Sequence, residues 1–219
     1  MVPREKFNAE KRQLYEYSQL LCSDTIRQLE SALEAAEKAD LSLCESVSRQ
    51  GEHLRQLEQI IDDMAARIIA LEAPVAGDLR LFITYIKVGS DFERISRHAE
   101  HLARSTQTIH DGFMKAFIPR IRTMVETTIT MLKAIGTALA EPETDALEQI
   151  PHLDDVIDGI YKEMREEVSA RLKSDISLVE DGVAFLMLLR YLERAGDHAT
   201  NIAEWIYFAR TGKHIDLND

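Results

Sequence analysis

A twelve-residue pattern occurs twice in this chain, and the two copies lie one hundred residues apart. The first copy spans residues 92–103 and reads FERISRHAEHLA, and the second spans 192–203 and reads LERAGDHATNIA. Both keep Glu-Arg, then His-Ala, then an aliphatic residue followed by Ala at the same offsets. Such self-similarity indicates an internal duplication. We therefore expect two copies of one structural unit, and the two halves can be compared position by position.

The hydrophobic pattern is helical along nearly the whole chain. Apolar residues alternate spacings of three and four through Leu54, Leu57, Ile61, Met64, Ile68 and Leu71. Similar stripes run through both copies of the repeated segment, and strand-like alternation occurs nowhere at useful length. With only 9 Gly and 5 Pro in 219 residues, the sequence predicts an all-α globular protein.

Turn and capping residues divide the chain into six long helices. The first begins near Pro3 or Asn8 and ends near Glu37, and Asp40 is the expected N-cap of the second. The segment Ala-Pro-Val-Ala-Gly at 73–77 separates the second helix from the third, which we expect to end at Asp111-Gly112.

The second half repeats this arrangement. Pro119 suits the first turn of the fourth helix, which reaches about Ala140. Pro151 predicts a kink in the fifth helix or a late start for it. The last helix begins near Asp175 or Ser177 and ends before Gly212. Several of these helices have about 30 residues and are therefore about 45–50 Å long.

Three helices per half with short connections predict two pseudo-symmetric antiparallel three-helix bundles. We assign them to residues 1–112 and 113–219.

Charge and cysteine content narrow the function classes. Lys and Arg number 26 against 38 Asp and Glu, a net charge of −12, which argues against general binding to nucleic acid or anionic lipid. Cys22 and Cys44 have no metal-ligand spacing and are expected to be buried free thiols in a reducing compartment. The chain starts without a signal-peptide pattern, and its longest uncharged run, 182–189, is too short to span a membrane. We expect a cytoplasmic protein.

A polar stripe runs beside the apolar stripe of the last helix, about 100° around it. Glu193 and Asp197 lie one turn apart on that stripe and can reach a common point. If the fifth and sixth helices form a hairpin, Asp158 comes level with Glu193. Asp155 then lies nearby and Asn201 one turn further on. We expect no basic residue among these four carboxylates, which would therefore repel one another unless hydrated, protonated or bound to cations.

Oxygen ligands favour hard cations. The sequence therefore predicts a site for Fe, Mn or Mg formed by Glu193, Asp197, Asp158, Asp155 and Asn201.

The first repeat differs at two of these positions. Gln59 stands where the second repeat has Asp155, and Arg97 stands where it has Asp197. We expect Arg97 to neutralise Glu93 and Asp62 directly, as a metal would otherwise do. Glu93 and Asp62 are thus the weaker candidates, and metal is expected in the second repeat only.

Two alternatives remain open. Acidic residues one turn apart are often a solvated helix face, so a structural helical dimer or a metal-binding bundle without regulatory function is consistent with the pattern. A carboxylate-bridged di-iron enzyme would use Glu-x-x-His, and none of the seven histidines has Glu three residues before it. His98 and His198 follow the repeated Glu by five residues, on the wrong face to share a metal, and are expected to cap or pack. We expect no enzymatic activity.

The order of these segments resembles the PhoU family. The resemblance rests on the two Glu-Arg-x-x-x-His copies, on APVAGDLR at 73–80 before the first copy, and on NIAEWIY at 201–207. It covers the whole chain.

Membership would imply a cytoplasmic regulator of phosphate homeostasis. Proteins of this family connect the high-affinity phosphate ABC transporter, through its ATPase subunit, with a sensor histidine kinase, and they restrain phosphate uptake and the phosphate-starvation response. Contact with the membrane is then only indirect, through the transporter, and a homodimer is the default assembly. The resemblance also implies metal clusters on an acidic motif in each repeat, and here that motif is complete only as Glu193 and Asp197.

Overall fold

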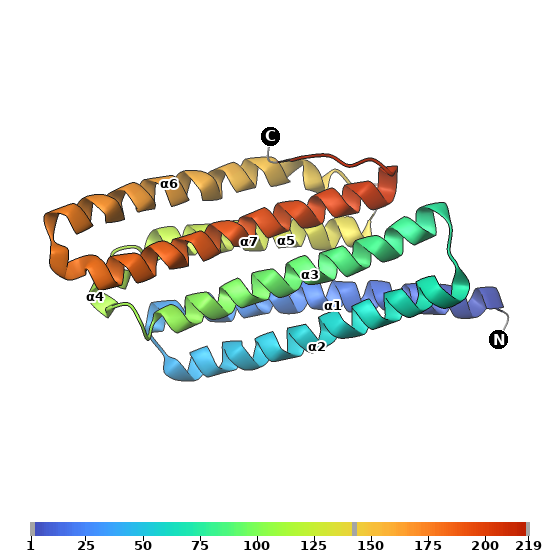
Figure 1. Ribbon diagram of the computed structural model, residues 1–219, viewed down its shortest axis with the longest axis horizontal. Helices are drawn as coiled ribbons and strands as arrows, with labels where there is room; N and C mark the ends of the chain where they lie inside the picture. Colours follow the sequence, from blue (N-terminus) through green and yellow to red (C-terminus); the bar gives the residue numbers. More distant parts are fainter. Residues whose placement is uncertain (1–2, 142–143, 218–219) are drawn as a thin grey trace.

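The computed structural model describes residues 3–141 and 144–217, and in this part of the chain all regular structure is helical (Figure 1). Six long helices are present, as predicted: α1 (Pro3–Lys38), α2 (Leu41–Glu72), α3 (Ala76–Ser105), α5 (Ile118–Ala140), α6 (Ile150–Ser174) and α7 (Val179–Thr211). Three shorter elements join them, namely α4 (Asp111–Lys115) and the 3₁₀ turns η1 (Ala146–Gln149) and η2 (Ile176–Leu178). None of the described helices is long and apolar enough to cross a membrane.

Most helix ends fall where the sequence predicts them. Asp40 caps α2, accepting a hydrogen bond from the Ser42 amide at 2.8 Å, and Pro119 lies in the first turn of α5. Pro151 marks a late helix start, because η1 precedes it and α6 begins only at Ile150. Gly212 ends α7 with a φ of 72°, which glycine adopts without the steric cost that a Cβ would add.

The predicted end of the third helix is wrong by about six residues. α3 ends at Ser105 rather than at Asp111-Gly112, and residues 111–115 form the separate short helix α4. The apolar spacing continues past the true end because Ile109 is buried by the turn instead of by the helix. Periodicity alone does not distinguish these two cases.

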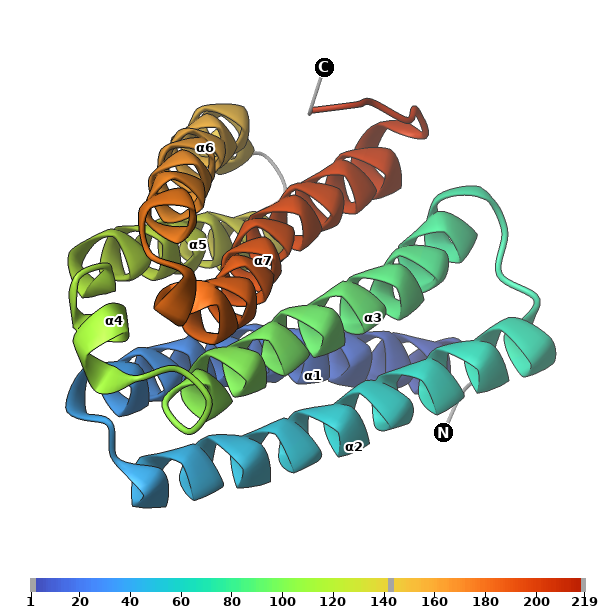
Figure 2. The same ribbon diagram turned by 60° about the vertical axis from the view of Figure 1, so that its left-hand side comes forward.

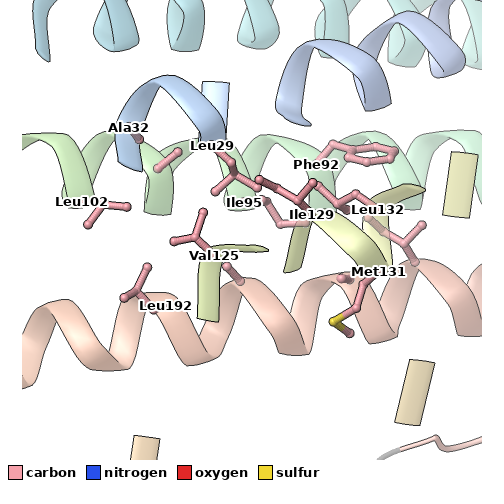
Figure 3. Packing of buried hydrophobic residues seen from close by; sticks show 14 of the residues in the cluster. Leu29, Ala32, Phe92, Ile95, Leu102, Val125, Ile129, Met131, Leu132 and Leu192 are labelled. Carbon is pink, nitrogen blue, oxygen red and sulfur yellow. The ribbon is translucent and has the colours of Figure 1, made fainter. Parts of the chain in front are cut away.

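The helices form two bundles, α1–α3 and α5–α7, that meet along α3 and α7 (Figures 1 and 2). α3 and α7 run antiparallel, so each places its copy of the repeated segment at the centre of the contact. We call this contact the α3–α7 seam. Figure 3 shows Leu29 and Ile95 of the first bundle beside Val125 and Ile129 of the second, and all four are buried. One continuous apolar core therefore unites both repeats.

The two cysteines are free and buried, as predicted. Burial raises the pKa of the Cys22 thiol to about 12, which makes it unreactive.

Candidate metal centre in the second repeat

An acidic cavity of about 230 Å³ lies between α6 and α7. It is lined by five carboxylates, namely Asp154, Asp155 and Asp158 of α6 and Glu193 and Asp197 of α7. The structure thus brings together four of the five residues named from the sequence. The fifth, Asn201, lines a different hollow between α3 and α7, beside Lys87 and Arg94. Asp154 was not singled out in the sequence.

Crowding of like charges raises the pKa values in this cavity. Burial and repulsion from Asp197 and Asp158 raise the pKa of Asp154 to about 7. Burial, followed by repulsion from Asp197, also raises the pKa of Glu193. The pKa of Asp197 rises because of burial and of Asp158. The ionised form of these carboxylates is thus less favourable than in water, as expected of a partly buried cluster in which carboxylates outnumber basic groups.

Two basic residues reach the cluster, which corrects the expectation of none. Lys162 Nζ lies 3.9 Å from Asp158 Oδ2, one turn along α6. The Arg190 guanidinium donates to Glu193 Oε1 from one turn earlier on α7. The other carboxylate oxygen, Glu193 Oε2, is buried without a hydrogen-bond partner. Buried polar atoms of this kind are few in native proteins, and a bound ion or an ordered water is a common partner for them.

The donor chemistry of the cavity fits a hard cation, since carboxylate oxygens are the ligands that Mg²⁺, Mn²⁺ and ferric iron accept. Gly196 makes room for one of these ligands, because a Cβ there would lie 2.9 Å from Asp154 Oδ1. Among the described residues, however, no three His, Cys, Asp or Glu side chains are grouped closely enough to hold an ion as they stand. Binding would require the carboxylates to turn inward.

The corresponding place in the first repeat holds an ion pair. Arg97 donates from Nε to Glu93 Oε1 at 2.6 Å and from Nη2 to Glu93 Oε2 at 2.7 Å, so Glu93 is neutralised as predicted. Arg97 does not bond to Asp62, whose Oδ1 is buried without a partner. Burial and then Asp63 raise the pKa of Asp62. Glu58 belongs to the same group, because burial, Asp62 and Glu93 together raise its pKa.

The repeated histidines pack in the α3–α7 seam, one of the two roles predicted for them. His198 Nδ1 lies 2.9 Å from Asp91 Oδ1, with both side chains buried. The ring of His98 stacks on Tyr191, with centroids 5.5 Å apart, and on His198, at 5.7 Å. Because the two sequence copies are one hundred residues apart, Asp91 and Tyr191 are equivalent positions, and each contacts the histidine of the other repeat.

Two pseudo-symmetric three-helix bundles in one chain, with a carboxylate cavity in one of them, define a class of duplicated helical-bundle proteins. The PhoU domain matches residues 19–106 and 121–206, so the chain belongs to the PhoU family. The resemblance noted from the sequence is thereby confirmed.

Individual relatives cover the whole chain. The phosphate-specific transport system accessory protein PhoU homolog of Clostridium acetobutylicum is 29% identical over 219 residues, all of both chains. The homolog of Pseudomonas aeruginosa is 29% identical over 217 residues, covering 97% of this chain and 90% of its own. The crystal structure of PhoU from P. aeruginosa superimposes with a TM-score of 0.85 at 27% identity, covering 94% of this chain and 100% of that one. PhoU from Streptococcus pneumoniae, at 24% identity, shares the fold with a TM-score of 0.86 over 96% of this chain and 99% of its own.

Proposed function

We propose that this protein is a cytoplasmic regulator of phosphate homeostasis and acts as an accessory protein of a phosphate-specific transport system. The observation that carries the proposal is the match over the full length of both chains to an accessory protein of phosphate-specific transport. The relatives are named as accessory proteins rather than as enzymes, in agreement with the expected lack of enzymatic activity. The long rigid helix faces are suited to holding partner proteins.

The finer proposal is that the protein connects the transporter's ATPase subunit with a phosphate-sensing histidine kinase. In this arrangement it restrains uptake and keeps the starvation response off when phosphate is abundant. A homodimer is the proposed assembly. Contact with the membrane would be made only through the transporter, and the net charge of −12 supports the absence of a direct hold on anionic lipid.

Affinity capture tests the adaptor role. The tagged chain is recovered from phosphate-replete and phosphate-starved cells, and the retained partners are identified by mass spectrometry. We expect the phosphate-transporter ATPase and a sensor kinase, in amounts that change with phosphate. Recovery of neither partner under either condition would contradict the proposal.

We further propose that a hard cation, Fe, Mn or Mg, binds in the second repeat. Asp154, Asp155, Asp158, Glu193 and Asp197 would hold it, with the unpartnered Glu193 Oε2 facing the cation. The cation would add to the positive charge of Arg190 and Lys162 and would link α6 to α7. In the first repeat Arg97 already supplies that charge to Glu93, so we propose little or no metal there.

Anomalous scattering from crystals soaked in Mn or Fe tests this assignment. We expect a peak between α6 and α7 that disappears in Glu193→Gln and Asp197→Asn. Asp62→Asn in the first repeat is the matched control and should leave the peak unchanged. Equal occupancy of both repeats, or no peak in either, would contradict the assignment.

A further inference from the structure

The hollow that contains Asn201 has a volume of about 360 Å³ and lies between α3, α7 and the segment that follows Gly212. We call it the α3–α7 hollow. It shares no lining residue with the acidic cavity. The side chains used below are Lys87, Ser90, Asp91 and Arg94 of α3 and Asn201 and Trp205 of α7.

The internal duplication identifies an equivalent place at the α3–α7 seam, and there the space is filled. The offset of one hundred residues relates Asp91 to Tyr191 and Asn201 to His101. The rings of Tyr191 and His101 stack with centroids 4.0 Å apart and an interplanar angle of 12°. In the α3–α7 hollow two short polar side chains stand in place of that ring pair, so the volume is open to a ligand.

Hydrogen-bond donors on two helices face the hollow without a protein partner. In residues 3–141 and 144–217, the side chains of Ser90, Arg94 and Asn201 make no hydrogen bond or ion pair with the protein. Lys87 has no carboxylate partner in the same residues, and its Nζ lies 5.6 Å from the centroid of the Trp205 ring. The spacings of three and four residues place Lys87, Ser90 and Arg94 on one face of α3.

The two carboxylates that also line the hollow are already engaged. Asp91 is buried, and its Oδ1 lies 2.9 Å from His198 Nδ1. Glu204 Oε1 accepts a hydrogen bond from the Leu217 amide at 2.8 Å. The unused hydrogen-bonding capacity of the hollow therefore consists mainly of donors, two of which are cations, and it favours an anion over a metal ion.

We propose that the α3–α7 hollow binds a tetrahedral oxyanion, as free phosphate or as the phosphoryl group of a small molecule. Arg94 and Lys87 would hold its charge, since guanidinium and ammonium groups both bind phosphate. Ser90 and Asn201 would donate to further oxygens. A tetrahedral oxyanion presents its oxygens in several directions and so accepts from donors on two helices, whereas the oxygens of a carboxylate share one plane. The inference rests on the hollow alone and not on the proposed function.

The fluorescence of Trp205 provides a direct readout, because this residue is the only tryptophan of the chain and lines the hollow. Metal-free full-length protein is titrated with sodium phosphate and, separately, with phenyl phosphate, at an ionic strength held constant with chloride. We expect a saturable change with at least one of them. Tighter binding of phenyl phosphate would assign the hollow to a phosphorylated small molecule, and tighter binding of inorganic phosphate would assign it to the free ion.

Three glutamine variants make the test specific. Arg94→Gln and Lys87→Gln should each weaken binding about tenfold or more, because each removes a charged donor. Both side chains are exposed, so these variants should fold as the wild type does. Arg194→Gln is the matched control and should leave binding unchanged. Arg194 is the exposed counterpart of Arg94, but it lies at the place that Tyr191 and His101 fill.

Three outcomes would overturn the proposal. The first is the absence of a saturable change with either anion. The second is binding that Arg94→Gln and Lys87→Gln leave as tight as in the wild type. The third is a loss of affinity in Arg194→Gln as large as that in Arg94→Gln, which would show an effect of net charge rather than of a site.

Discussion

Among the carboxylates of the acidic cavity, Asp154 has the most strongly raised pKa. Its carboxyl lies next to Gly196 on the neighbouring helix, where any side chain would press against it. Burial is the largest cause of its raised pKa, and Asp197 and Asp158 add repulsion. Without a cation, the folded protein therefore holds a proton at Asp154 that an unfolded chain releases at its ordinary pKa near 3.8.

The contribution of Asp154 to the stability of the metal-free protein is expected to fall as the pH rises from about 4 to about 7. Over this interval the folded state binds more protons than the unfolded state, so the free energy of unfolding falls with pH. A pKa difference between 3.8 and about 7 corresponds to roughly 4 kcal/mol. Because the side chain is only partly buried and water screens it, we expect about 2 kcal/mol.

Asp154→Asn tests this expectation by urea unfolding at several pH values in a chelator. The variant should be more stable than the wild type at pH 7.5 by about 2 kcal/mol, and this difference should disappear as the pH falls to about 4. Asp155→Asn, whose side chain is exposed, is the control and should follow the wild type. Parallel curves for wild type and Asp154→Asn would contradict the assignment.

The sequence predicts most of this cluster but not Asp154, for a geometric reason. Glu193 and Asp197 share a helix face, so their spacing alone brings them together. Which of the adjacent residues Asp154 and Asp155 points inward depends on the rotation of α6 against α7, and spacing within one helix does not determine it. The alignment of the repeats offered a signal, since Glu58 is the counterpart of Asp154 and is likewise acidic and partly buried.

At the scale of the elements, the α3–α7 seam is the most extensive contact between two of the described helices. It buries the hydrogen-bonded side chains of His198 and Asp91, and it also contains the stacked rings of His98 and Tyr191. Both ring nitrogens of His98 are buried without a hydrogen-bond partner. Burial, followed by His198 and His101, lowers the pKa of His98 to about 4. The seam therefore favours neutral His98.

His98 gives the seam a pH dependence opposite in sign to that of Asp154. Between pH 6.5 and about 4 the unfolded chain binds a proton at this histidine and the folded protein does not, so stability is lost as the pH falls. We expect a loss of about 2 kcal/mol, reduced from the full pKa difference because the ring is only partly buried. His98→Phe should remove this loss, so that stability rises on acidification through the Asp154 effect alone.

Urea unfolding of His98→Phe from pH 4 to 7.5 is the measurement, with the exposed His152→Phe as control. The prediction is wrong if the stability of His98→Phe varies with pH in the same way as that of the wild type and of His152→Phe.

Among the elements, those with a local signal were predictable. Asp40, Pro119, Pro151 and Gly212 act within one turn of their own position, and the helix ends they imply are present. α4 was missed because it is specified by distant contacts. Phe113 of α4, and Phe117 just after it, pack on the ring of Phe185, about seventy residues away in the sequence. The role of Arg190 was missed for a similar reason. Whether its guanidinium bonds to Glu193 or points into solvent depends on the shape of the cavity.

At the scale of the whole molecule, the two repeats have diverged in how the charge of their acidic residues is compensated. The first repeat compensates Glu93 with the guanidinium of Arg97, whereas in the second repeat five carboxylates share Arg190 and Lys162. If the proposed cation binds there, it stabilises the second repeat and not the first. A protein of this design can couple metal occupancy to the packing of one bundle and leave the other unchanged.

We predict that the first repeat can be converted into a second metal site. Arg97→Asp combined with Gln59→Asp restores the two missing carboxylates, and Ser96→Gly restores the space that Gly196 provides next to Asp154. Without metal the triple variant should be less stable than the wild type by about 1–3 kcal/mol, because buried Glu93 loses its paired donors. With Mn²⁺ in excess this loss should be recovered, since a ligand that binds only the folded state stabilises it.

Metal content after gel filtration provides the decisive measurement. If the acidic cavity of the second repeat binds one complement of metal, the triple variant should bind about twice as much per chain, since the same oxygen donors are then present in both repeats. Ser96→Gly alone keeps Arg97 and should bind no more than the wild type. An unchanged metal content in the triple variant, despite a folded α3–α7 seam, would show that the charge of Arg97 is not what distinguishes the repeats. The difference in metal binding between the repeats would then have to lie in how α6 is rotated against α7 and α2 against α3.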